Sequence, residues 1–231
     1  MNIIRAGSRG AFKNEWLDSR HSFSFGEYYD PNRMGFSTLR VINEDWVAAK
    51  GGFPTHGHRD MEIITYVMEG ALSHKDSLGN GSTIRPGDVQ RMSAGRGILH
   101  SEFNHSTDES VHLLQIWILP KFSGIQPGYA QAYFPLEERR GKLQLVASAD
   151  GREDSLSMNT DASLYASILE AGQTAYFVKP EKRAVYVHVA RGELLLNGEH
   201  LQAGDAAEIR EETELAFSAD TSAEFLLFDL P

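Results

Sequence analysis

The chain has 231 residues, of which 41% are hydrophobic and 10% aromatic, so it is long enough and apolar enough to bury a sizeable core. Its 22 basic and 32 acidic residues leave a net charge of −10, and no cluster of Lys and Arg offers a surface for direct nucleic-acid binding. The sequence contains no cysteine, which excludes disulfides, thiol catalysis and thiolate-bound metals.

No apolar run reaches the length of a signal peptide core or of a membrane span. We therefore expect no membrane association and a cytoplasmic location.

Short apolar runs rich in Val, Ile, Leu, Phe and Tyr recur along the whole chain, separated by Gly and Pro. This pattern favours an antiparallel all-β sandwich or barrel over a helical or α/β fold. Asn-Gly within Asp76 to Gly81 predicts a tight hairpin turn, and "PLEERRGK" at 135–142 predicts one short helical turn. The predicted strands lie within residues 35–43, 46–54, 62–72, 110–120, 142–148, 164–172, 184–198 and 223–231.

A faint internal repeat divides the chain into two halves. "TYVMEGAL" at 65–72, followed by "RPGDVQRM" at 85–92, resembles "VHVARGEL" at 187–194, followed by "QAGDAAEI" at 202–209. Each copy reads Val-x-x-Gly-x-Leu, a hairpin, and then Gly-Asp before an apolar alternation. We expect two β-barrel domains of the same kind, residues 1–134 and 135–231, connected through the Pro- and Gly-containing stretch 121–142.

Two pairs of polar residues in the first half share a spacing that brings ligands together. His56 and His58 are two residues apart at a strand-like segment, and His100 and Glu102 repeat the spacing. In an extended strand, residues i and i+2 point to the same face. Neighbouring strands would therefore bring three imidazoles and one carboxylate into one cavity, a donor set typical of a transition-metal site. Four protein ligands would leave an octahedral ion two open positions.

An isolated His-x-His often has no function, and the second half of the chain serves as a control. Aligning the glycines of the two repeats places Val178 and Pro180 where His56 and His58 stand. The same alignment places Phe217 and Ala219 where His100 and Glu102 stand. Because none of these four residues is a ligand, a barrel of this kind does not need the polar side chains for packing. We therefore interpret them as functional and expect one metal ion per chain, in the N-terminal domain.

The spacing His-x-His, a glutamate four residues on, and a Gly-Asp strand leading to a third histidine is similar to the two cupin motifs. More specifically, the N-terminal half resembles the pirin family of bicupins. The resemblance rests on "HSFSFGEYYDPNRMGFSTLRVINED" at 21–45, "HGHRDMEIITYVMEG" at 56–70, "GDVQRMSAGRGILHSE" at 87–102 and "LLQIWI" at 113–118.

The resemblance implies two cupin barrels of the jelly-roll type, the second one degenerate, and a metal held by His56, His58, His100 and Glu102. It also implies the quercetin 2,3-dioxygenase activity of bacterial pirins, in which O2 opens the central ring of a flavonol and carbon monoxide is released. Glu102 would then also be the general base. Fe(II) is the expected ion, and Ni, Co, Cu and Zn suit the same donors. Glu62, the carboxylate of the first motif, shares the parity of His56 and His58, and only the family resemblance excludes it as a ligand.

An alternative of a different class stays open. Pirins are also metal-dependent binding partners of transcription factors or metabolic enzymes, and such a regulator would need the same four ligands. Other polar residues have further interpretations. For His21, a surface or hydrogen-bonding role is favoured over one in which it lines the mouth of the site. His74 and Asp76 would stabilise a turn, and Gln115 and Trp117 would line the cavity or pack in the core.

Overall fold

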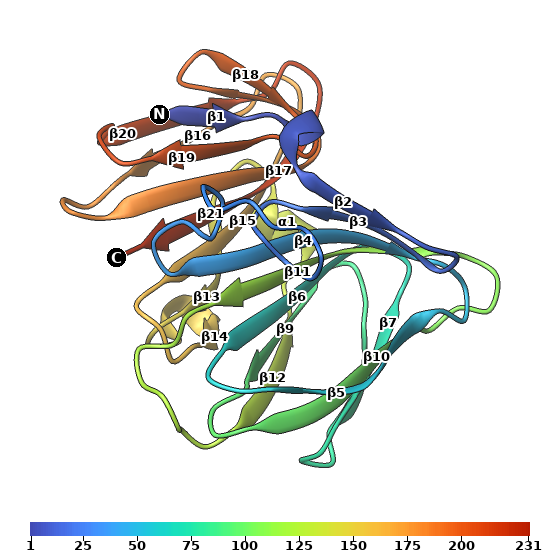
Figure 1. Ribbon diagram of the computed structural model, residues 1–231. Coiled ribbons are helices and arrows are strands. Elements are labelled where there is room, and N and C mark those ends of the chain that lie inside the picture. Colours follow the sequence, from blue (N-terminus) through green and yellow to red (C-terminus); the bar gives the residue numbers. More distant parts are fainter. The chain divides into compact units, whose positions relative to one another are not determined.

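The structure is a computed structural model that describes all residues from Met1 to Pro231, and the chain divides into two compact units (Figure 1). The N-terminal unit comprises Arg9–Tyr133 with Met158–Thr160, and the C-terminal unit comprises Met1–Ser8, Phe134–Ser157 and Asp161–Pro231. These units differ from the expected division at the first eight residues, at Phe134 and at Met158–Thr160. The first residues differ because β1 (Asn2–Ile4) pairs with β19 (Ala206–Ile209) and so belongs to the C-terminal unit.

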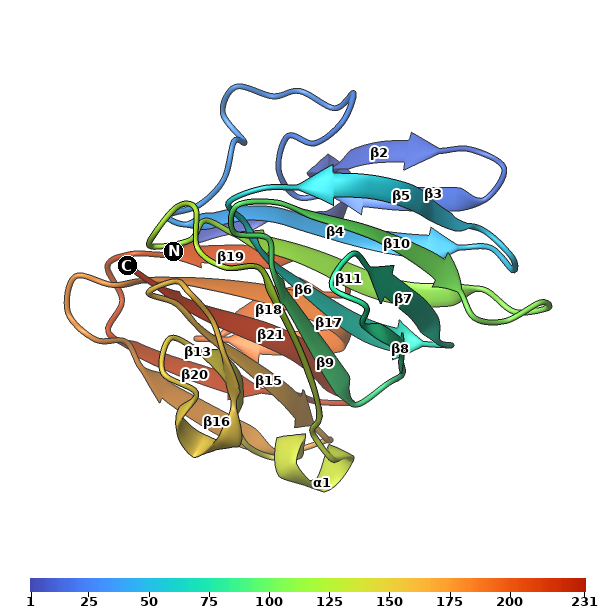
Figure 2. The same cartoon turned by 90° about the horizontal axis from the view of Figure 1, so that it is seen from below.

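Two antiparallel sheets form the N-terminal unit. The larger sheet has the strand order β12-β9-β6-β11-β4-β3-β2 and the smaller one the order β5-β10-β7-β8. Within the smaller sheet, β10 lies between β5 and β7 (Figures 1 and 2). The strands of the larger sheet are β2 (Gly10–Lys13), β3 (Leu17–His21), β4 (Leu39–Val47), β6 (Glu62–Glu69), β9 (Asp88–Ser93), β11 (Val111–Ile118) and β12 (Gly128–Tyr133). Those of the smaller sheet are β5 (Gly52–His58), β7 (Leu72–Asp76), β8 (Gly81–Ile84) and β10 (Ile98–Asn104).

Two separate apolar clusters hold these sheets together. One contains Val67 and Leu113 with residues of both sheets, and the other contains Ile63 and Ile98, packed against Trp117. Every second side chain of a strand points inward. On β6, the inward-facing residue between Ile63 and Val67 is therefore Thr65. In the same way Gln115 lies between Leu113 and Trp117 on β11. A polar band therefore crosses the inside of the larger sheet between its two apolar clusters.

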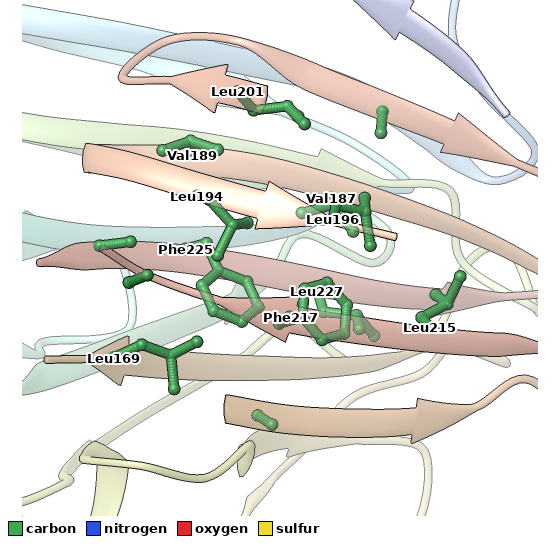
Figure 3. Packing of buried hydrophobic residues seen from close by; sticks show 14 of the residues in the cluster. Leu169, Val187, Val189, Leu194, Leu196, Leu201, Leu215, Phe217, Phe225 and Leu227 are labelled. Carbon is green, nitrogen blue, oxygen red and sulfur yellow. The ribbon is translucent and has the colours of Figure 1, made fainter. Parts of the chain in front are cut away.

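The C-terminal unit is built around one continuous apolar core, shown in Figure 3, to which Leu194, Phe217 and Phe225 contribute. The rings of Phe217 and Phe225 stack with their centroids 4.8 Å apart. Besides β1 and β19, the strands of the C-terminal unit are β13 (Gln144–Ser148), β14 (Leu156–Ser157), β15 (Ser163–Leu169), β16 (Thr174–Val178), β17 (Ala184–Leu196), β18 (Glu199–Gln202), β20 (Glu214–Ser218) and β21 (Ala223–Leu230). Its helical segments are η1 (Ala6–Ser8), α1 (Leu136–Arg139) and η2 (Arg152–Asp154).

The backbone bears out the internal repeat. Gly70 and Gly192 occupy equivalent positions and have φ angles of 75° and 72°, in the left-handed region. A Cβ atom at Gly192 would lie 1.8 Å from the carbonyl oxygen of Ser222, and one at Gly70 would lie 2.9 Å from that of Ser110. Only glycine combines that conformation with so close an approach of the paired strand. The repeat thus reflects a shared backbone path rather than shared side chains.

Two local expectations need correction, and one is confirmed. The hairpin between β7 and β8 forms, but the left-handed residue is Gly79 (φ 91°) and not the Asn80-Gly81 pair. The Asp76 carboxylate fixes this turn, because it accepts hydrogen bonds from the backbone N–H groups of Leu78 and Asn80. The expected connecting stretch 121–142 contains β12, which pairs with β9 and so belongs to the larger sheet. The short helical turn expected within 135–142 is α1.

No helix in the structure is both long enough and apolar enough to cross a membrane.

Candidate functional site

The two polar pairs predicted from spacing meet on adjacent strands. His56 and His58 lie on β5, His100 and Glu102 lie on β10, and in the antiparallel register His100 stands directly opposite His56. One possible ligand atom from each of the three imidazoles lies within 4.8 Å of the others. The register of β5 and β10 therefore brings the three imidazoles together, whereas Glu102 groups with His100 and with His74 of β7.

The hydrogen bond of His56 determines which of its nitrogens can bind a metal. Its Nδ1 lies 2.8 Å from the carbonyl oxygen of Pro54. A carbonyl oxygen can only accept, so Nδ1 carries the proton and Nε2 has the free lone pair. This Nε2 lies 3.0 Å from Nε2 of His100. Two nitrogens bound at right angles to one ion, each at about 2.1 Å, would be about 3.0 Å apart, so the pair fits a shared metal.

Burial keeps the other two imidazoles neutral. It lowers the pKa of His58 to about 4, and the neighbouring His56 adds to the effect. Burial also lowers the pKa of His100 to about 3, and the three histidines around it, His56, His58 and His74, lower it further. A neutral imidazole presents the lone pair that a metal needs, whereas a protonated one does not. Both rings are therefore ready to coordinate at neutral pH.

The carboxylate of Glu102 is 2% exposed and is held from the opposite sheet. Nε2 of Gln115 lies 3.1 and 3.0 Å from its two oxygens and donates to both. The hydroxyl of Thr65 donates to Oε1 of Gln115 at 2.9 Å, which fixes the orientation of the amide. Burial raises the pKa of Glu102 to about 7, and its hydrogen bonds with Gln115 and Thr65 oppose that rise. Glu102 is thus a more basic carboxylate than an exposed glutamate.

His74 adds a fourth imidazole that the spacing argument did not include. It stands opposite Glu102 on β7, and its possible ligand atoms lie within 4.8 Å of those of His100 and Glu102. Its Nε2 is 3.4 Å from Oδ2 of Asp76, so the expected pairing with Asp76 is present. Burial lowers its pKa and Asp76 opposes the shift. Only the cross-strand register of β7 and β10 indicates that His74 lies here, and this register cannot be read from the sequence.

Glu62 lies outside this group, although its parity suggested otherwise. The chain turns at Asp60, whose φ is 48°, and enters β6 of the larger sheet, so strand parity does not carry over from β5. Its Oε2 accepts a hydrogen bond of 2.8 Å from the hydroxyl of Ser93. Burial raises its pKa, and Ser93 and Arg91 are among the groups that oppose this.

Three of the four metal-ligand candidates, His56, His58 and Glu102, line a cavity of about 260 Å³ within the N-terminal unit. Gln115 and Trp117 line it too, and Trp117 also packs against the apolar cluster that contains Ile63. The ring of Trp117 meets that of His58 edge-on, with the centroids 4.9 Å apart. The apolar part of the wall comprises Phe12, Leu17, Phe25, Phe53 and Trp117.

A second set of polar residues lines the same cavity, from β3 and β4. Ser19 and Asp45 face each other across these strands, as do His21 and Asn43. The hydroxyl of Ser19 donates to Oδ1 of Asp45. Burial raises the pKa of Asp45 to about 7, and the charges of Glu102 and Glu44 add to it. His21 thus lines the cavity, in contrast to the surface or hydrogen-bonding role that the sequence favoured.

In the C-terminal unit, β16 and β20 pair as β5 and β10 do, but they carry other side chains. Phe217 stands opposite Ala175, whereas Val178 stands opposite Glu214 and is 72% exposed. The glycine alignment therefore misjudged the register of β16 by three residues. Phe217 and Ala219 are buried in the apolar core. In either register, the positions opposite Phe217 and Ala219 hold no histidine or carboxylate ligand pair.

Two β units of one backbone plan, with histidines and a carboxylate gathered in the first, define a bicupin. The model of the family described as pirin matches residues 5–118, and that described as the quercetinase C-terminal cupin domain matches residues 145–230. The chain belongs to the pirin family.

Relatives extend over almost the whole chain. A protein of Escherichia coli strain K12 named quercetin 2,3-dioxygenase is 47% identical over 230 residues, 99% of this chain and 98% of its own length. A pirin-like protein of Caulobacter vibrioides is 42% identical over 221 residues, 95% of each chain. The crystal structure of the bacterial pirin YhhW from Escherichia coli in complex with nickel(II) superposes with a TM-score of 0.95 at 45% identity. It covers 100% of this chain and 98% of that one.

The buried carboxyl of Asp45 predicts a pH-dependent stability. Because its folded pKa is raised, the unfolded chain releases this proton first, and the folded state loses relative stability as pH rises from about 4 to about 7. Asp45→Asn keeps an oxygen that accepts from Ser19 and removes the ionisation. We compare the free energy of unfolding of the metal-free variant with that of the metal-free parent. We expect this difference to favour the variant by on the order of 2–3 kcal/mol more at pH 8 than at pH 5.

Urea unfolding of both proteins at the two pH values measures this difference. Asp108→Asn, at an exposed loop position, is the control and should give no comparable gain. Equal stability differences for Asp45→Asn at pH 5 and pH 8 would contradict the prediction.

Proposed function

We propose that this protein is a metal-dependent quercetin 2,3-dioxygenase, which uses O2 to open the central ring of flavonols and releases carbon monoxide. The observation that carries the proposal is the site itself. Three imidazoles lie within 4.8 Å of one another, and two of them, together with the buried carboxylate of Glu102, line a largely apolar cavity. The 47% identity with a quercetin 2,3-dioxygenase over nearly the full length of both chains supports the same activity.

His56, His58, His100 and Glu102 would hold one divalent transition metal. Their donor set suits Fe, Ni, Co, Cu or Zn, and among these we expect Fe(II). The nickel(II) complex of YhhW supports the binding of a divalent metal. When bound, the metal supplies Lewis acidity and open coordination positions for the flavonol and O2. His74 lies close enough to His100 and Glu102 to be a further ligand candidate or to position them.

The residues of the chain would perform the proton transfer and the positioning. Glu102 would take the proton of the flavonol 3-hydroxyl as general base, because its carboxylate lines the cavity in which the flavonol would bind. Gln115 keeps both oxygens of Glu102 in place during this transfer. Phe53 and Trp117 provide apolar walls for planar rings and keep water from the reacting atoms. The cavity of about 260 Å³ lies slightly below the usual range of ligand pockets, roughly 300–1,000 Å³, and so favours one compact, planar molecule.

The test of the function is consumption of quercetin by the metal-loaded protein. We expect the visible absorbance of quercetin to fall under air and to persist under anaerobic conditions, with carbon monoxide detected in the headspace of the aerobic sample. If the absorbance under air stayed unchanged with every one of the candidate metals, the dioxygenase proposal would be wrong. That outcome would favour the alternative of a metal-dependent regulator that binds another protein.

A metal stoichiometry follows from the two units. The ligand candidates lie in the N-terminal unit, while the paired strands β16 and β20 carry apolar residues. Elemental analysis after a mild chelator wash is expected to give one equivalent of metal per chain. Two equivalents that survive the wash would show that the C-terminal unit binds metal too.

Separate substitution of Glu102 and Glu62 tests which of the two glutamates binds the metal. Glu102→Gln keeps an oxygen that can coordinate but removes the charge and the basicity, so part of the metal should be retained. Activity should fall on the order of 10²-fold or more, the usual scale of general base catalysis. Glu62→Gln is the matched control, because Glu62 is equally buried but bonded to Ser93 and outside the cavity lining.

Metal content and quercetin turnover of both variants provide the measurement. If Glu62→Gln removed the metal while Glu102→Gln left turnover intact, the carboxylate ligand would be Glu62 and our assignment would be wrong.

A further inference from the structure

The polar band across the larger sheet continues beyond the residues that hold Glu102. In the strand register Thr65 stands opposite Gln115, Gln115 opposite Asn43, and Asn43 opposite His21. Gln115, Asn43 and His21 all line the cavity. Adjacent strands are about 4.8 Å apart, so the row extends about 10 Å from Gln115 on β11 to His21 on β3. The far end of this row is thus well separated from Glu102.

The side chains at that far end hold polar atoms without partners. Asn43 is 4% exposed and His21 is 5% exposed, and neither Oδ1 of Asn43 nor Nδ1 of His21 has a hydrogen-bond partner. Buried polar atoms are almost always hydrogen-bonded, so each exception calls for an explanation. These two residues face each other on the wall of one cavity, so the hydroxyl groups of a bound molecule would supply the missing hydrogen-bond partners. The carboxyl of Asp45, which accepts from Ser19, adds another acceptor beside them.

We propose that Asn43, His21 and Asp45 form a second anchoring site, which binds phenolic hydroxyl groups on the part of the substrate remote from Glu102. This inference rests on the proposed function and gives it a substrate class, polyhydroxylated flavonols rather than flavonols in general. A phenolic hydroxyl both donates and accepts, which matches an amide and an imidazole placed side by side. The site acts on binding and specificity and takes no part in the reaction at Glu102.

The selectivity has a physical cause. A substrate without distal hydroxyls would leave the amide of Asn43 and the ring of His21 buried without partners. A site built to bind hydroxyl groups therefore discriminates against the analogue that lacks them. A purely structural role of Asn43 and His21 would make no such distinction between ligands.

The experiment compares quercetin with 3-hydroxyflavone, which keeps only the hydroxyl next to the carbonyl. Affinities are measured anaerobically on the nickel(II)-loaded protein by quenching of tryptophan fluorescence, since Trp117 lines the cavity. We expect the parent to bind quercetin at least tenfold more tightly than 3-hydroxyflavone. Asn43→Leu should reduce this ratio by about fivefold, the scale of one lost hydrogen bond. His21→Leu is a second, independent variant with the same expected direction.

Gln90→Leu provides the matched control. Gln90 belongs to the same cross-strand row, opposite Thr65 on β9, is 1% exposed and also has an unpartnered Oε1, but it does not line the cavity. Its substitution should leave the affinity ratio at the parental value. The control thus separates the loss of a buried amide from the loss of an amide that contacts the ligand.

The outcomes distinguish this inference from the proposed function. An affinity ratio that neither Asn43→Leu nor His21→Leu changes would overturn the second anchoring site, and so would a parent that binds both flavonols equally. If the ratio falls as expected but quercetin is not consumed under air, the second anchoring site stands and the dioxygenase proposal fails.

Discussion

The hydrogen bonds from Gln115 to both oxygens of Glu102 are the interaction on which the site depends. Glu102 belongs to the smaller sheet and Gln115 to the larger one, so these bonds join the two sheets at the site itself. A buried carboxylate is costly unless it is well paired, and the donated amide protons offset part of that cost. Thr65 fixes the amide in turn. Without this arrangement, Glu102 would be a buried acid without a defined direction rather than a candidate ligand that lines a cavity.

The same bonds require an interruption of the hydrophobic core. The apolar clusters around Val67 and around Ile63 lie on either side of the polar band, and each contains residues of both sheets. The two clusters hold the sheets together, and the band between them leaves room for the cavity. The candidate site therefore lies in the middle of the sandwich, and the apolar clusters that stabilise the fold lie on either side of it.

Sequence reasoning found what lies within single strands and missed what depends on pairing. The i, i+2 spacing placed His56 with His58 and His100 with Glu102 because parity holds along one strand. The same argument failed for Glu62, since the chain leaves the sheet at Asp60 before β6 begins. Asn43 lines the cavity and His74 lies beside His100 and Glu102, but both come from strands whose register is set by distant contacts, and no local spacing indicates these positions.

The two units show what the polar band replaces. In the C-terminal unit the strands that correspond to β5 and β10 contribute Ala175 and Phe217 to one continuous core. At these two positions a unit of this plan packs with apolar residues, and burying apolar area there stabilises it by roughly 25 cal/mol per Å². The N-terminal unit gives up part of that stabilisation to hold imidazoles, a carboxylate and unpartnered amides. Ligands that bind only the folded state return stability by linkage. The unit that carries the site thus depends on what it binds to a degree that its partner in the chain does not.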